Sequence, residues 1–79
     1  MARAIFRASI NGPTPNNKQA ELSKVLLAAH FRKIGTASYE GEFARYRDAL
    51  AAVSVGIAFL NALPNEYELD HLWTYVDRT

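Results

Sequence analysis

The sequence predicts a single α+β domain over residues 1–79, with its elements in the order strand, helix, strand, helix, strand. Apolar residues alternate with other residues near both ends of the chain, which is the period of a strand. Two internal segments instead repeat apolar residues at steps of three and four, which is the period of a helix. Hydrophobic residues make up 49% of the chain and charged residues 22%, a composition typical of folded domains.

The first predicted strand covers residues 2–10, where one face is apolar and the other is largely polar. The apolar face, which we expect to pack on the core, carries Ala4, Phe6, Ala8 and Ile10. The opposite face carries Arg3, Arg7 and Ser9. Asn11, Gly12 and Pro13 then form a turn cluster that ends the strand.

The first helix is predicted over residues 17–30. Asn16 is a suitable N-cap with Gln19 three residues later. The apolar residues that follow at helical spacing are Leu22, Val25, Leu26 and Ala29. Residues 31–42 then mix residues that favour strands with two glycines, so they predict a strand with a bend or bulge near Gly35. Whether this segment is one strand or two stays open.

A long second helix is predicted over residues 42–63 and ends at Pro64 and Asn65. Its main apolar stripe comprises Phe43, Tyr46, Leu50, Val53, Ile57 and Leu60. Further apolar residues widen this stripe, namely Ala51, Ala52, Val55 and Ala58. So broad a face in so small a domain indicates contact with the sheet and with a second surface, such as another subunit.

The last predicted strand covers residues 69–76 and is rich in aromatic residues. Right-handed crossovers place both helices on the same face of the sheet. The expected architecture is therefore a ferredoxin-like β-α-β-(β)-α-β sandwich, with two helices on one face of an antiparallel sheet and the other face open.

The open face carries the predicted binding residues. They are Arg3, Arg7, Arg32 or Lys33, Trp73 and Tyr75. Arginines and aromatic rings on a sheet suit contacts with phosphates and stacking of bases, as in sheets that bind RNA. The same residue types are also enriched in protein interfaces, so a dimer or partner surface is the alternative.

The chemistry of the chain favours binding over catalysis. The net charge is +1, and the chain has no cysteine, no glycine-rich phosphate loop and no paired-histidine motif, so we expect no cofactor and no metal. His30 is expected at a helix end, where a cation is favourable, and His71 within a strand. Glu40, Glu42 and Asp48 are acidic residues near a helix start, where they suit the helix dipole.

Neither the apolar segment of the second helix nor the start of the chain predicts a membrane protein or a secreted one. The apolar segment 49–63 is shorter than the roughly 20 residues that a membrane span requires. Residues 1–10 alternate and lack the apolar stretch of a signal peptide. We therefore expect a cytoplasmic protein without membrane contact.

Residues 31–43, FRKIGTASYEGEF, resemble the central strand region of the small CRISPR adaptation proteins and of virulence-associated protein D, a related family of toxin-like ribonucleases. The resemblance implies a ferredoxin-like homodimer and either metal-dependent RNA cleavage or binding of duplex DNA. These families have an aspartate near the end of the first strand that holds a divalent cation across the dimer. Arg7 stands about where that aspartate would be, and a guanidinium is no ligand for Mg²⁺.

Three hypotheses follow. The first is a homodimeric protein that binds RNA or duplex DNA without a metal-dependent nuclease site. In it Arg3, Arg7, Arg32 and Lys33 contact phosphates. The second is a small regulatory or inhibitor protein that acts through protein contacts. The third is a metal-independent endoribonuclease with His30 or His71 as general base, because histidine titrates near neutral pH.

Overall fold

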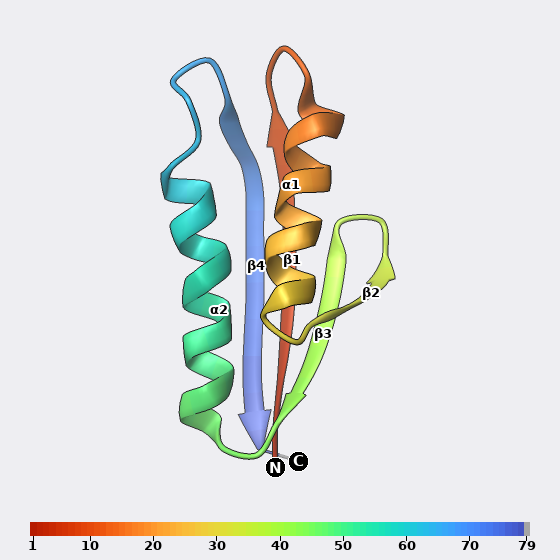
Figure 1. The fold of residues 1–79 in the computed structure, drawn as a ribbon, viewed down its shortest axis with the longest axis vertical. Helices are drawn as coiled ribbons and strands as arrows, with labels where there is room; N and C mark the ends of the chain where they lie inside the picture. Colours follow the sequence, from red (N-terminus) through yellow and green to blue (C-terminus); the bar gives the residue numbers. More distant parts are fainter. Residues whose placement is uncertain (79) are drawn as a thin grey trace.

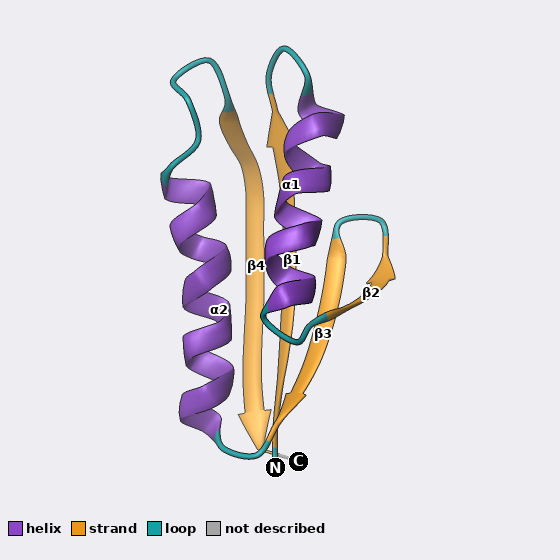
Figure 2. Cartoon of the chain, in the orientation of Figure 1, coloured by secondary structure: helices purple, strands orange, loops and turns teal. Residues whose placement is uncertain are grey.

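The computed structural model describes residues 1–78, which form two helices and one four-stranded sheet (Figure 1). The elements are β1 (Ala2–Asn11), α1 (Pro15–Ala28), β2 (Arg32–Gly35), β3 (Ser38–Phe43), α2 (Tyr46–Asn61) and β4 (Glu68–Arg78). The sheet is antiparallel in the order β2-β3-β1-β4, and both helices lie on one of its faces (Figure 2). The predicted ferredoxin-like α+β sandwich is confirmed.

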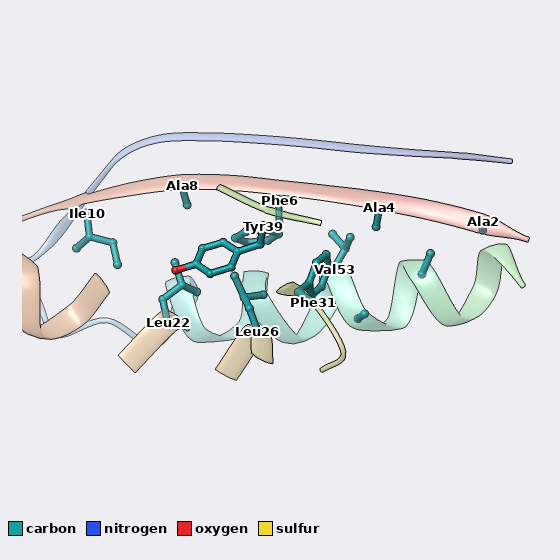
Figure 3. Packing of buried hydrophobic residues seen from close by; sticks show 12 residues of the cluster. Ala2, Ala4, Phe6, Ala8, Ile10, Leu22, Leu26, Phe31, Tyr39 and Val53 are labelled. Atoms are coloured by element: carbon teal, nitrogen blue, oxygen red, sulfur yellow. The ribbon is translucent and has the colours of Figure 1, made fainter. Parts of the chain in front are cut away.

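The core lies between β1 and the two helices (Figure 3). Every second residue of β1 is buried, as the alternation predicts: Ala2, Ala4, Phe6, Ala8 and Ile10. Most of these side chains are methyl groups, so the larger side chains of the core come from the other elements. Leu22 and Leu26 of α1 and Tyr39 of β3 are buried against this strand.

Helix α1 begins two residues earlier than predicted. Thr14 takes the N-cap position and Pro15 the first turn, where the missing N–H of proline removes no helical hydrogen bond. Gln19 has a different role from the predicted cap. Its side-chain oxygen accepts the N–H of Ile10 at 2.7 Å, so it fastens the helix to the end of β1.

The C-terminal end of α1 is a Schellman motif. The N–H of His30 donates to the carbonyl of Leu27, and the N–H of Phe31 donates to the carbonyl of Leu26. His30 adopts a left-handed backbone with φ 75°. The rings of Phe31 and Phe6 then meet edge to face, with their centroids 6.3 Å apart. This motif turns the chain sharply from the helix into β2.

The segment that the sequence predicts as either one strand or two forms two strands, β2 and β3. A turn at residues 36–37 joins them, and Ala37 adopts a φ of 60°. The pairing register shifts between Lys33 and Gly35, close to the predicted bend. The N–H of Ala8 donates to the carbonyl of Ala37 at 3.2 Å, which ties this hairpin to β1.

Helix α2 is shorter than predicted because residues 42–43 belong to β3. Phe43 has the spacing of the helical stripe but belongs to β3, where its ring packs edge to face on Phe31. The inner face of α2 is buried through Ala49, Ala52, Val53 and Gly56. Its outer face leaves apolar side chains exposed, among them Leu50 and Val55. No helix within residues 1–78 is long and apolar enough to cross a membrane.

Candidate functional site

The face of the sheet away from the helices, called the open face here, is defined by the strand register. Residues of β1 that alternate with the buried ones point to this face: Arg3, Ile5, Arg7 and Ser9. Because directly paired residues of antiparallel strands share a face, their partners lie there too. These partners are Ser38, Glu40 and Glu42 on β3, and His71, Trp73, Tyr75 and Asp77 on β4.

The structure brings most of the predicted binding residues together on the open face. Arg3, Arg7, Trp73 and Tyr75 lie there by register. Arg32 and Lys33 were both predicted to contact nucleic acid, and only one of them lies on this face. Arg32 pairs with Glu40 and so lies on the open face. Lys33 pairs with the buried Tyr39, so its side chain belongs to the helix side of the sheet.

Arg7, Trp73 and Tyr75 form one cluster, called the aromatic cluster here. The guanidinium carbon of Arg7 lies 5.3 Å from the centre of the Trp73 ring, within the range of a cation–π contact. The rings of Trp73 and Tyr75 are nearly parallel, at 7°, with centroids 5.9 Å apart. Trp73 is 46% exposed and Tyr75 is 43% exposed. Two large aromatic side chains therefore face solvent beside a cation.

A row of charged side chains crosses the open face next to the aromatic cluster. Arg32 on β2 donates to Glu40 on β3 at 2.7 Å, and Glu40 also lies 4.0 Å from Arg3 on β1. Arg3 in turn donates to Asp77 on β4 at 3.3 Å. The hydrogen bond to Glu40 raises the pKa of Arg32 above its ordinary value. This row connects all four strands.

The charged row leaves the open face close to electrically neutral. Along the part of the open face beside residues 3–9 of β1, the three arginines (Arg3, Arg7 and Arg32) are balanced by the three carboxylates of Glu40, Glu42 and Asp77. Two of these arginines, Arg3 and Arg32, form ion pairs. Within residues 1–78, Arg7 forms no ion pair and contacts Trp73 instead. Arg7 is therefore the basic side chain of this face that is most available to an anionic ligand.

A second candidate lies on the helix side, where a groove of about 740 Å³ runs between α1, the end of β1 and the β2-β3 hairpin. Lys24 and Lys33 line this groove, together with Asn16, Gln19 and Tyr39, and no carboxylate within residues 1–78 does. No local pattern in the sequence predicts this groove, because Lys24 and Lys33 stand on different elements.

The histidines and the predicted acidic group are separated in the structure. His30 follows α1 on the helix side, whereas His71 lies on the open face opposite Ser9. Glu40 is held by arginines, and Asp48 lies 3.4 Å from Arg45 at the start of α2. Within residues 1–78, no group of three or more histidine, aspartate or glutamate side chains could hold a metal ion.

Comparison with known proteins adds no family assignment. No family model matches the sequence, and no protein of curated function matches it. The resemblance of residues 31–43 to the CRISPR adaptation and virulence-associated protein D families stays a prediction.

Proposed function

We propose that this protein binds single-stranded nucleic acid, RNA above all, on the open face of its sheet, and that it does so as a homodimer. The aromatic cluster is the observation that carries the proposal. Exposed aromatic rings on a sheet stack on unpaired bases, and an adjacent arginine contacts a phosphate or stacks as well. Trp73 and Tyr75 supply the rings, and Arg7 supplies the cation.

The charged row favours single strands over duplex DNA. A duplex hides the faces of its bases and is bound mainly through its phosphates. Arg3 and Arg32 are engaged by Glu40 and Asp77, so few cations of the open face are free for phosphates. Binding that depends on stacking suits a single strand, whose bases are accessible.

We expect the bound nucleic acid not to be cleaved by a metal-dependent reaction. The resemblance implies an aspartate where Arg7 stands, and Arg7 contacts Trp73. Glu40 and Asp77 are the carboxylates of the charged row, and both already bind arginines. A guanidinium in such a place repels a divalent cation. If the protein does cleave RNA, we expect an endoribonuclease that works without a metal.

Protein contact is the second candidate function, and the balanced charge of the open face favours it. Arginine and aromatic residues are typical of the centres of protein interfaces. The outer face of α2 adds exposed apolar side chains, including Leu50 and Val55. A small regulatory or inhibitor protein would use either surface to hold a partner.

Tryptophan fluorescence can test whether nucleic acid binds to the open face. Trp73 is the single tryptophan of the chain and lies in the aromatic cluster. A titration would follow its fluorescence with unlabelled single-stranded RNA, single-stranded DNA and duplex DNA, at two salt concentrations, with and without Mg²⁺. We expect the single strands to quench the fluorescence and to remain uncleaved, and we expect the duplex to have a weaker effect.

Variants make the titration specific. Replacing Tyr75 with alanine should weaken binding roughly tenfold or more, since stacking on one ring contributes about 1–3 kcal/mol per base. Tyr46→Ala is the matched control, because Tyr46 is an exposed tyrosine on α2, away from the open face. Equal binding of RNA by the natural protein, Tyr75→Ala and Tyr46→Ala would contradict the proposal. So would the absence of quenching by any nucleic acid. A stoichiometric protein partner that needs Trp73 would then support the second candidate.

A further inference from the structure

β4 is an edge strand whose outer side is unpaired over its whole length. Ten of its 11 residues pair with β1 on one side, and no strand of residues 1–78 lies on the other (Figure 1). A long free edge exposes backbone N–H and C=O groups that readily pair with another strand. Monomeric proteins protect such edges with lysine, proline, bulges or a short strand.

The opposite edge of the sheet has this protection, and most of β4 lacks it. β2 has four residues, carries Arg32 and Lys33, and shifts its register before Gly35. β4 contains neither lysine nor proline. Its register shift lies near its start, at Asp70, so residues 71–77 run regularly beside β1. This stretch is the part of the sheet best suited to pair with a further strand.

We propose that two copies of this protein pair antiparallel through their β4 edges, with Thr74 of each copy meeting at the twofold axis. In this register each residue faces a chemically matched residue of the other copy. The facing pairs are Trp73 with Tyr75, Leu72 with Val76, and His71 with Asp77. Asp70 lies next to Arg78 of the other copy at the end of the pairing. Aromatic, apolar and opposite-charge pairs across strands each stabilise a sheet.

Neighbouring registers lose this complementarity. An axis at Tyr75 would set Trp73 opposite Asp77 and Leu72 opposite Arg78. An axis at Trp73 would set Leu69 opposite Asp77. Both place an apolar side chain against a charge, which forfeits the cross-strand contact. The axis at Thr74 is therefore the register that the sequence of β4 favours.

This pairing rests on the proposed homodimer and extends its binding surface. It continues the two sheets into one, with the two open faces on the same side. Trp73 of one copy then lies beside Tyr75 of the other, so the two aromatic clusters form one row of four rings. A row of this kind would stack more bases of a single strand than one copy can.

A cysteine cross-link tests the register directly, because the natural chain has no cysteine. In an antiparallel pair, facing Cα atoms are about 4.5–5.5 Å apart, which lies within the span of a disulfide. Thr74→Cys should therefore give a disulfide-linked dimer under mild oxidation. Leu72→Cys is the matched control on the same strand, since its copies would lie four residues apart, roughly 13 Å along the strand. Val55→Cys on the outer face of α2 tests the competing surface.

A charge exchange provides a second measurement in the natural background. Asp70→Arg should weaken the dimer about fivefold, because each dimer contains two copies of the Asp70 and Arg78 contact. The double variant Asp70→Arg with Arg78→Asp should restore it. Sedimentation of both variants beside the natural protein gives the dissociation constants.

The outcomes separate this inference from the homodimer itself. A monomer at every concentration would overturn both. A dimer that links through Val55→Cys, while Thr74→Cys stays unlinked, would keep the homodimer and overturn pairing through β4. Equal linking by Leu72→Cys and Thr74→Cys would overturn the register. Linking by Thr74→Cys alone, with rescue by the charge exchange, is the result that we expect.

Discussion

Gly56 of α2 packs directly against the ring of Phe6, so that a Cβ atom at position 56 would stand 2.7 Å from two atoms of that ring. Phe6 is fully buried, and a side-chain atom of Leu26 lies 3.0 Å from the same point. The glycine therefore sets how closely α2 approaches β1.

We expect Gly56→Ala to destabilise the protein, although alanine is the better helix former. Alanine gains about 1 kcal/mol of helix propensity. Overpacking of a filled core costs about 1–3 kcal/mol, so over most of this range the cost exceeds the gain. Urea unfolding should show a lower midpoint for this variant. Ser54→Ala on the exposed side of the same helix is the control, with a change within about 0.5 kcal/mol. A stability at or above that of the natural protein would refute the tight contact.

A second prediction concerns the end of α1, where His30 holds the left-handed position of the Schellman motif. A residue with a Cβ atom pays about 1–2 kcal/mol there, whereas glycine adopts this conformation freely. After the greater chain entropy of glycine is subtracted, His30→Gly should stabilise the protein by about 0.5–1 kcal/mol. Thermal unfolding measures the gain. Ala29→Gly, at a φ of −91°, should instead lower the stability.

The turn between β2 and β3 offers a third test. Ala37 has a φ of 60°, which costs an alanine about as much as it costs His30. Ala37→Gly should raise the free energy of unfolding by about 0.5–1 kcal/mol. Gly35→Ala serves as the comparison, since the nearest atom to its added Cβ would be 3.8 Å away and it needs no positive φ. A loss of stability in Ala37→Gly would mean that the turn has another conformation.

These local features also explain which parts of the fold the sequence predicted. The alternation of β1 identified its buried face correctly because one face of the strand meets the core along its whole length. The hairpin in residues 31–42 stayed ambiguous, because its turn uses Thr36 and Ala37 instead of the usual glycine, asparagine or proline. Phe43 suits a helix and a strand equally, so the sequence pattern predicts a start of α2 that is four residues too early.

The candidate site was predictable only in part. Strand alternation placed Arg3, Arg7, Trp73 and Tyr75 on one face, and the register agrees. The ion pair between Arg3 and Asp77 joins residues 74 positions apart, and no sequence pattern reveals such a contact. From the sequence alone, where this ion pair is not visible, Arg3 is expected to be available to phosphates, whereas in the structure it is paired.

The charged row yields the prediction that discriminates best between the candidate functions. Glu40 accepts a hydrogen bond from Arg32 and lies near Arg3, so Glu40→Gln would remove the charge that neutralises them while keeping the size of the side chain. Arg32 would then be available to a phosphate. If single-stranded RNA binds to the open face, the variant should bind it more tightly. Its affinity should also fall more steeply with salt, by a slope of about 0.7 for each new phosphate contact.

Glu21→Gln is the control for Glu40→Gln, because it makes the same change in net charge on α1, where Glu21 pairs with Lys18 on the helix side. The loss of stability should stay below about 1 kcal/mol for Glu21→Gln, whose side chain is 51% exposed. It should be larger for Glu40→Gln, whose side chain is 18% exposed and is held by two arginines. Tighter binding by Glu40→Gln alone would locate the nucleic acid on the open face. Equal gains in both variants would indicate a general effect of charge, and weaker binding of a protein partner by Glu40→Gln would favour the interface function.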